Sequence, residues 1–283
     1  MKNILIADAG STKTQWSFLT EEAGVKISFL TKGINPAHQN KDSVVSILQE
    51  VKERISPNKV DEIYFYGSGC ATPLLNRIIS SSLAFVFHTE KILVDTDIKG
   101  AAIALFGLND GIACILGTGS ASALYSKGNI ISQTPSLGYI LGDEGGGVAL
   151  GKHLLNAVFK KQLSKDIINR FQDRFELSLT ELIEKVYKEP KPAAFIASFS
   201  PFLLENLEEP EIRLIVENEF ENFFIKNLKT YPHRDDLNVG MVGSIAFNYK
   251  DILVSTADKL GYRIHKILKN PMPALEDYYL DKF

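Results

Sequence analysis

Residues 3–20, NILIADAGSTKTQWSFLT, contain the turn that decides the fold. The apolar run 3–7 predicts a strand, and a second strand is predicted to begin at Trp16. The Gly-, Ser- and Thr-rich residues 8–14 connect them, as is typical of a turn. Another turn at 21–24 and a third strand at 25–30 follow. We therefore expect the chain to begin with antiparallel strands joined by short turns.

The same order of strand, turn and strand returns near the middle of the chain. Residues 111–116 are apolar, 117–120 (GTGS) form a turn, and 121–125 predict a second strand. A turn at 127–129 then leads to a third strand at 130–134. Such turns are common in α/β proteins, so a chance match is the alternative. The shared order favours duplication of one α/β unit.

Helical and strand patterns alternate between these two hairpins. Apolar residues at helical spacing over 44–55 predict a helix, and further helices are predicted from residue 73 and over 98–106. Apolar runs at 60–66 and 92–94 predict strands. This alternation favours a largely parallel sheet with antiparallel hairpin strands at one side.

Length and pattern together predict two lobes. The chain has 283 residues, against about 150 per domain. After Gly147 it is mostly helical to about Thr230, and strand patterns return at 238–242 and 262–268. We expect an N-terminal lobe at 1–108, with the C-terminal segment 270–283 packed on it. We expect a second lobe at 109–269 that carries the helical insertion.

Composition excludes several classes of protein. The sequence is 45% hydrophobic and 23% charged with a net charge of −3, which argues against nucleic acid or an anionic membrane as the partner. Cys70 and Cys114 cannot form a disulfide framework, and the five histidines have no metal-ligand spacing. The apolar start is too short for a signal peptide, and no apolar run is long enough to cross a bilayer. We expect a soluble, cytoplasmic protein.

The first turn has the composition of an anion-binding loop. Its backbone N–H groups are surrounded by hydroxyls and an ammonium group, supplied by Gly10, Ser11, Thr12, Lys13 and Thr14. The carboxylate of Asp8 would be misplaced there unless a divalent cation such as Mg²⁺ is also bound. An ordinary polar hairpin turn is the alternative.

Two further glycine-rich segments imitate nucleotide motifs. The segment Gly117–Ser120 begins like a dinucleotide fingerprint, but Ser122 stands where its third glycine belongs and a strand follows, so a phosphate loop between strands fits better. Residues 146–152 match the P-loop pattern GxxxxGK, yet His153 replaces the metal-binding Ser or Thr and no strand precedes. We interpret these glycines as allowing the start of a helix to approach a ligand or the other lobe closely. His153 and Cys114 are interpreted as structural.

Two carboxylates are candidates for chemistry. Asp97 follows the apolar strand 92–94 and precedes a helix, and the carboxyl ends of parallel strands are where ligands bind. There it could accept a proton from a substrate hydroxyl; the alternative is a helix N-cap. Asp143, between Gly142 and Gly145, could accept hydrogen bonds from vicinal hydroxyls or simply close a turn.

Together these motifs resemble the actin-like, sugar-kinase ATPase superfamily. Within it they are most similar to the N-acetylglucosamine kinase branch, which is grouped with the BadF/BcrA-type ATPases. The resemblance rests on the order Asp8-x-Gly10-x-Thr12-Lys13-Thr14, Asp97, Gly117–Ser120, Gly142-Asp143-Glu144-Gly145 and Val242-Gly243-Ser244, which spans nearly the whole chain. It implies an α/β fold of two ribonuclease-H-like lobes, each with a mixed five-stranded sheet and helices, and a ligand cleft between the lobes.

The resemblance also implies an activity and a site. The activity is ATP-dependent phosphorylation of an amino sugar, most simply N-acetylglucosamine at its 6-hydroxyl, with Asp97 as general base. Asn35 and Asp143 would contact the sugar together with Asp97, and Asp8 would serve Mg²⁺ through water. The expected ATP-binding residues are Gly10, Ser11, Thr12, Lys13, Thr14, Thr118, Gly119, Ser120, Gly243 and Ser244. Homodimers are the default for enzymes of this size.

The chain departs from the family pattern at several positions. Leu137 and Tyr139 replace a Trp and a His that relatives commonly carry near the hexose, so the identity of the sugar stays open. The usual Gly-Ala ending is altered at 273–276, and the zinc cysteine cluster of the repressor/kinase branch is absent. Two alternative functions remain: an ATPase activator of a redox enzyme, and a nucleotide-binding sensor without kinase activity.

Overall fold

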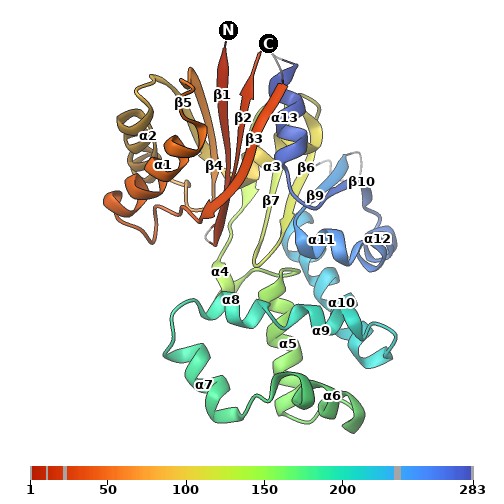
Figure 1. Ribbon diagram of the computed structural model, residues 1–283. Coiled ribbons are helices and arrows are strands. Elements are labelled where there is room, and N and C mark those ends of the chain that lie inside the picture. The colour runs from red at the N-terminus through yellow and green to blue at the C-terminus, as the bar shows by residue number, and fades with distance from the viewer. Residues whose placement is uncertain (1, 11, 22–23, 233–236, 282–283) are drawn as a thin grey trace. The chain divides into compact units, whose positions relative to one another are not determined.

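A computed structural model describes residues 2–10, 12–21, 24–232 and 237–281, except for the side chains of residues 24–26. The chain divides into two compact units, each built on a five-stranded sheet (Figure 1). The first unit comprises Met1–Asn109, Lys127–Asn129 and Asn270–Phe283, and the second Asp110–Ser126 and Ile130–Lys269.

The first sheet has the strand order β3-β2-β1-β4-β5. Strand β1 pairs antiparallel with β2 and parallel with β4, and β4 pairs parallel with β5. The strands are β1 (Asn3–Ala9), β2 (Lys13–Thr20), β3 (Gly24–Lys32), β4 (Glu62–Gly67) and β5 (Lys91–Thr96). The helices of this unit are α1 (Lys41–Ile55), α2 (Pro73–Phe87), α3 (Asp97–Phe106) and α13 (Met272–Leu280).

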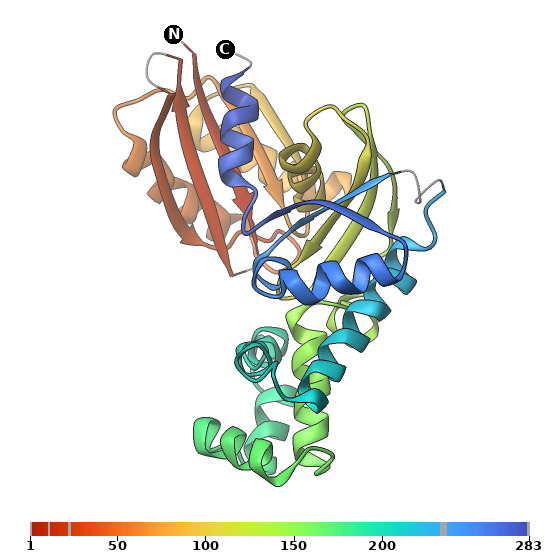
Figure 2. The ribbon, with the colours of Figure 1, turned by 90° about the vertical axis from the view of Figure 1, so that its right-hand side faces the viewer.

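Apolar faces of the helices close the core of the first unit. Helix α1 buries the face predicted from its spacing, including Val44, Leu48 and Val51. On the sheet, Trp16 is fully buried, with its ring 6.1 Å from that of Phe65. The C-terminal helix α13 lies against the first sheet, as Figure 2 shows, and it packs on α3, β1 and β2. This helix therefore belongs to the unit in which the chain begins.

The second sheet has the order β10-β9-β6-β7-β8. Strand β6 pairs antiparallel with β7 and parallel with β9, and β9 pairs parallel with β10. The strands are β6 (Gly111–Leu116), β7 (Ser120–Ser126), β8 (Asn129–Thr134), β9 (Asn238–Val242) and β10 (Arg263–Leu268). Numbered by first appearance within each unit, both sheets have the strand order 3-2-1-4-5, as the duplication hypothesis predicts.

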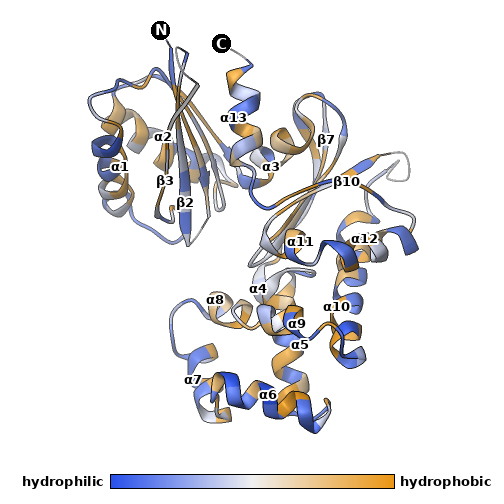
Figure 3. Ribbon diagram, turned by 45° about the vertical axis from the view of Figure 1, so that its right-hand side comes forward, coloured by the Kyte–Doolittle hydropathy of each residue, from blue (hydrophilic) through white to orange (hydrophobic). Residues whose placement is uncertain are grey.

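Most helices of the second unit lie between β8 and β9. They are α4 (Gly138–Leu141), α5 (Gly147–Phe159), α6 (Lys165–Phe175), α7 (Leu179–Tyr187), α8 (Pro192–Ala197), α9 (Ser200–Glu205), α10 (Pro210–Phe223) and the π-helix η1 (Phe224–Leu228), with α11 (Ser244–Asn248) and α12 (Lys250–Lys259) after β9. The apolar and polar sides of α6 are distinguishable in Figure 3, and Ile167 and Phe171 on this helix are buried. Amphipathic patterning thus explains how the insertion forms its own core.

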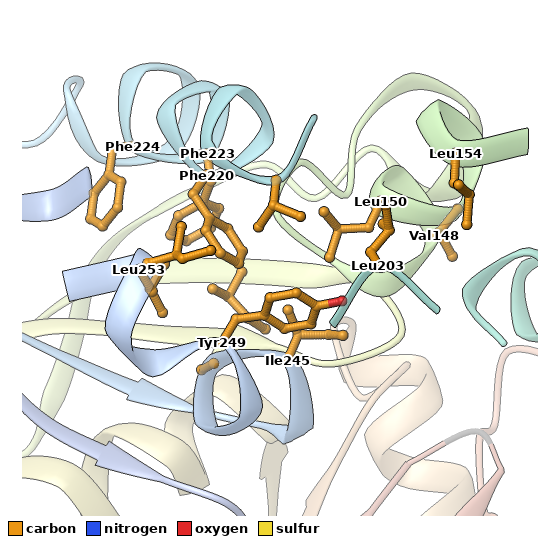
Figure 4. Packing of buried hydrophobic residues seen from close by; sticks show 14 of the residues in the cluster. Val148, Leu150, Leu154, Leu203, Phe220, Phe223, Phe224, Ile245, Tyr249 and Leu253 are labelled. Carbon is orange, nitrogen blue, oxygen red and sulfur yellow. The ribbon is translucent and has the colours of Figure 1, made fainter. Parts of the chain in front are cut away.

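Aromatic and aliphatic side chains from several helices meet in this core. Figure 4 shows Phe220 and Phe223 of α10 facing Tyr249 and Leu253, with Leu150 of α5 beside them. The rings of Phe220 and Tyr249 are 5.8 Å apart and nearly perpendicular, an arrangement that aromatic pairs prefer. Helices α5, α10 and α12 are therefore fixed relative to one another within the second unit.

The observed elements confirm the predicted α/β class with two mixed five-stranded sheets. Within the mostly helical stretch, the amphipathic pattern over 211–229 predicts one continuous helix. The structure instead ends α10 at Phe223 and continues as a π-helix. A π-helix keeps the apolar face of the segment, so hydrophobic spacing alone does not distinguish it. Along the described residues, no helix has the length and apolar character that a membrane span requires.

Replacing Gly151 with Ala is expected to destabilise the protein by about 2 kcal/mol, because overpacking costs this much when backbone must move. A Cβ atom at Gly151 would overlap the backbone carbonyl of Ile196 on α8. In an open helix the same change stabilises by about 1 kcal/mol, so the sign of the effect is diagnostic. Urea unfolding measures it, with Asn156→Ala at an exposed position of α5 as the control. A more stable Gly151→Ala variant would contradict the packing described.

Candidate functional site

Acidic side chains gather at the carboxyl ends of strands in the first sheet. In the strand register Asp8 of β1 is opposite Tyr66 of β4, and Tyr66 is opposite Asp95 of β5. Asp97 begins α3 two residues later. The N-cap of α3 is Thr96, whose hydroxyl accepts the N–H of Lys99. The capping role that was the alternative for Asp97 is therefore filled by Thr96.

Burial makes this corner unfavourable for negative charge. Burial and, to a smaller extent, the charge of Asp97 raise the pKa of Asp8 to about 7, and the charge of Lys13 opposes the shift. Burial also raises the pKa of Asp97, although its Oδ1 accepts the Ile98 N–H at 2.8 Å. Two carboxylates whose charges interact in a partly dry site attract a cation or a proton.

The first hairpin turn is held by its own backbone. The N–H of Gly10 donates to the carbonyl of Lys13 at 3.0 Å, and Thr12 and Lys13 are exposed. Thr14 is fully buried, and its hydroxyl accepts the Ile34 N–H at 3.1 Å. This hydroxyl therefore supports the segment that carries Asn35 and is not presented to solvent. The predicted phosphate ligand Ser11 lies outside the described residues.

Asn35 lies in a loop that is tied to the first hairpin. Its side-chain Oδ1 accepts the Ala37 N–H at 3.0 Å, and the residue is 8% exposed. A Cβ atom at Gly69 would overlap the Asn35 side chain, so glycine is needed for the close approach. Gly67, Ser68 and Gly69 at the end of β4, which the sequence interpretation omitted, thus belong to this neighbourhood. Their Gly-Ser-Gly composition at the end of a strand is the signal that could have identified them.

In the second unit Asp143 contacts the second predicted phosphate loop directly. Its Oδ1 accepts the Ser120 N–H at 3.1 Å. A Cβ atom at Gly119 would lie 2.6 Å from the same oxygen, so the carboxylate covers this glycine. Burial raises the pKa of Asp143, and the Ser120 hydrogen bond and the charge of Lys152 oppose the shift. The contact joins two predicted motifs that are 23 residues apart in the sequence.

The start of α5 packs on the same loop. The N–H of Gly147 donates to the Gly117 carbonyl at 2.8 Å, and the N–H of Val148 donates to the Thr118 carbonyl at 2.9 Å. A Cβ atom at Gly146 would lie 2.7 Å from the backbone of Gly119. The glycines thus allow a close approach to a loop of the same unit, whereas the sequence predicted an approach to a ligand or to the other lobe. Lys152 donates to the carbonyl of Tyr139 at 2.9 Å, unlike a P-loop lysine.

The predicted motif at Gly243 and Ser244 follows β9, and it lies next to the loop that follows β6. Strands β6 and β9 are parallel neighbours, with Ile115 opposite Val242. Gly243 follows β9 with a φ of 126°, and a Cβ atom there would overlap the carbonyl of Leu116. Ser244 is exposed at the start of α11. The second unit thus brings together the predicted residues Thr118, Gly119, Ser120, Asp143, Gly243 and Ser244.

A polar cavity of about 200 Å³ opens beside Asp143. Lys226 of η1 pairs with Glu144 at its wall, with 3.3 Å between Nζ and Oε1. The lining residues are Ser120, Thr134, Pro135, Ser136, Leu137, Gly142, Asp143, Glu144, Lys226 and Asn227. Hydroxyl, amide and carboxylate groups of this kind can hydrogen-bond a polyhydroxylated ligand.

The cysteines lie apart from any surface at which a shared iron–sulfur cluster could bind. Cys114 is fully buried within β6, and Cys70 after β4 is 2% exposed. Burial raises the pKa of Cys70 to about 12, whereas a cluster ligand must be a thiolate. These features disfavour the redox-activator alternative.

Comparisons with known proteins define first the class and then the family. No protein-family model matches the chain. A glucokinase of the repressor/kinase (ROK) group from Streptomyces griseus, solved with glucose and AMPPNP, shares the fold at a TM-score of 0.58 and 11% identity, over 98% of this chain and 97% of that one. The fold is therefore that of the two-lobed, actin-like sugar kinases.

A Porphyromonas gingivalis protein, inferred to be an N-acetylglucosamine kinase, is 37% identical over 99% of both chains with a TM-score of 0.90. The chain belongs to the N-acetylglucosamine kinase family, and the resemblance inferred from its motifs is confirmed. A Clostridium acetobutylicum N-acetylmuramic acid/N-acetylglucosamine kinase is 26% identical over 166 residues, which cover 56% of this chain and 54% of that kinase. This match thus spans about half the length of the curated relative.

Replacing Asp8 with Asn is expected to stabilise the ligand-free protein more at about pH 8 than at about pH 5. The folded-state pKa of Asp8 is raised from 3.8 to about 7. The folded protein is therefore at its most stable, as far as Asp8 is concerned, below the unfolded-state pKa of this group. That stability is lost as pH rises through the folded-state pKa of about 7. Because an amide never ionises, the variant escapes this loss, which amounts to about 2 kcal/mol between the two pH values.

Urea unfolding without Mg²⁺ at both pH values measures the difference between Asp8→Asn and wild type. Asp61→Asn, whose carboxylate accepts the backbone N–H of Asn3, serves as a control for loss of one negative charge. An Asp8→Asn gain that is equal at the two pH values would contradict the electrostatic description.

Proposed function

We propose that the protein is an ATP-dependent kinase of an amino sugar, with N-acetylglucosamine as the first candidate and its 6-hydroxyl as the acceptor. Membership of the N-acetylglucosamine kinase family supports the substrate class. The single observation that carries the chemistry is the pair of interacting carboxylates, Asp8 at the end of β1 and Asp97 just after β5, on either side of β4. The two compact units would be the two lobes of the kinase.

Asp97 would be the general base. A half-buried carboxylate with a raised pKa is a stronger proton acceptor, once ionised, than an ordinary surface aspartate. It would orient the primary hydroxyl of the sugar and take its proton as the phosphoryl group is transferred. Phosphoryl transfer depends mainly on positioning and on neutralisation of charge. The protein therefore needs to supply only one well-placed general base for the proton transfer.

The residues of the first unit fit a magnesium ion that arrives with ATP. Asp8 is an oxygen donor whose ionised form is unfavourable without a nearby cation. It would hold Mg²⁺ through bound water. When bound, Mg²⁺ neutralises charge on the phosphates of ATP. Gly10, Thr12 and Lys13 would contact phosphate from the first turn.

The residues of the second unit would bind the remainder of the nucleotide and part of the sugar. Thr118, Gly119 and Ser120 would offer loop donors to phosphate, while Gly243 and Ser244 would lie against adenosine. An ionised carboxylate has about four acceptor positions. Asp143 can therefore accept a sugar hydroxyl while it holds the Ser120 N–H, and Asn35 would contact the sugar from the first unit.

Purified protein with Mg-ATP is expected to phosphorylate at least one member of a panel of N-acetylglucosamine, glucosamine, N-acetylmannosamine and N-acetylmuramic acid. ADP release coupled to a sugar phosphate identified by mass spectrometry is the measurement. ATP binding with no phosphorylated sugar would favour the nucleotide sensor, and a brown, iron-containing anaerobic preparation would favour the redox activator.

In the same assay Asp97→Asn is expected to lower kcat by about 10²- to 10⁴-fold, the usual contribution of a general base, and to leave sugar affinity similar. The matched control is Asp95→Asn, which removes a neighbouring charge while an amide oxygen can still accept the Thr96 N–H. Near-wild-type turnover of Asp97→Asn with intact sugar binding would remove Asp97 from its assigned role.

A further inference from the structure

The turn that carries Asp143 has an unfavourable backbone. Asp143 has a φ of 60° and Gly145 a φ of 74°, both in the left-handed region. Glycine adopts this region readily, whereas it is uncommon for aspartate, so contacts around Asp143 help to hold its backbone. The hydrogen bond from the Gly146 N–H to the Asp143 carbonyl, at 3.0 Å, closes the turn but does not fix it to the rest of the unit.

Glu219 of α10 supplies a contact from outside the turn. Its Oε1 accepts the Gly145 N–H at 2.9 Å, and its Oε2 lies 2.9 Å from Nε2 of His153. Glu219 is only 2% exposed. A carboxylate is costly to bury unless its oxygens are hydrogen-bonded, and these two contacts meet that need. His153 is the residue that distinguishes this segment from a P-loop.

The turn is also seated against α10 by shape. A Cβ atom at Gly145 would lie 2.8 Å from Cβ of Phe223. Phe223 is four residues after Glu219, so both side chains project from one face of the helix. Helix α10 therefore restrains Gly145 by packing and by a hydrogen bond to its N–H.

Movement of the turn at residues 143–148 would also move the second phosphate loop at residues 117–120. The Asp143 carboxylate accepts the Ser120 N–H, and the N–H groups of Gly147 and Val148 donate to carbonyl oxygens of the same loop. These bonds link residues 143–148 to residues 117–120. A displacement at Gly145 would thus alter both the direction of the Asp143 carboxylate and the loop that it contacts.

We propose that Glu219 is a positioning residue for Asp143, and that His153 keeps the Glu219 carboxylate in the orientation this requires. Glu219 holds the Gly145 backbone, which sets the Asp143 carboxylate against Ser120 and toward the sugar. The role of Asp143 as a sugar ligand rests on the proposed function; the restraint of the turn does not. The contact between buried Glu219 and exposed His153 is thereby a part of the binding machinery and more than a support of the fold.

Two variants and a control test the proposal by hydrogen–deuterium exchange. Glu219→Gln retains the shape and an oxygen that can accept from Gly145, whereas Glu219→Ala removes the acceptor. Amide exchange in residues 117–120 and 142–148 is expected to be fastest in Glu219→Ala, slower in Glu219→Gln and slowest in wild type. Glu217→Gln on the same helix, where the carboxylate faces Lys259 at 3.9 Å, should match wild type.

Kinetics provide the second readout. Glu219→Ala is expected to raise the KM for the sugar about tenfold, since small misplacements of binding groups have effects of this order. The KM for ATP is expected to rise as well, because the second phosphate loop is linked to the same turn. Glu219→Gln and His153→Ala should give smaller changes of the same kind.

The two readouts separate the possible failures. Unchanged exchange in both segments for Glu219→Gln and Glu219→Ala would overturn the proposal, whatever the activity. A lower unfolding midpoint with unchanged sugar KM would also overturn it, because the pair would then be structural only. If the wild-type protein phosphorylates no sugar while exchange follows the expected order, the proposed function fails and the restraint of the turn by Glu219 stands.

Discussion

The electrostatic interaction between Asp8 and Asp97 is the constraint on which the first unit depends. Three parallel strand ends place these acids near each other, and partial burial disfavours their charged forms. A site of this kind is unfavourable for stability in the absence of a cation or a proton. Such unfavourable groups cluster where a protein performs chemistry, which is why the pair carries the functional argument.

The second unit has the same strand order as the first, but contacts with its loop after β6 take the place of interacting acids. Its loop after β6 is held by backbone donors from the start of α5 and by the Asp143 carboxylate. The loop is thus rigidly supported before any ligand arrives, which reduces the ordering cost of binding. Glycine is required at Gly119 and Gly146 because the backbones and the carboxylate approach so closely.

Local patterns were sufficient to predict the strands, the two hairpins, the α/β class and the position of Asp97 at a strand end. They could not predict that Thr14 turns its hydroxyl inward, because alternation along a strand does not reveal which face meets the Ile34 N–H. The contact of Asp143 with Ser120 depends on a left-handed backbone, which no residue pattern specifies. Glu219 lies 74 residues from Gly145 and looks in sequence like any acidic residue of a surface helix.

The most direct test of the central claim is a crystal structure with an amino sugar and a non-hydrolysable ATP analogue bound with Mg²⁺. The account predicts the primary hydroxyl oxygen of the sugar at about 2.5–3.0 Å from a carboxylate oxygen of Asp97, the range of a hydrogen bond to a carboxylate. A sugar bound with that hydroxyl out of reach of Asp97, beside some other base, would contradict it.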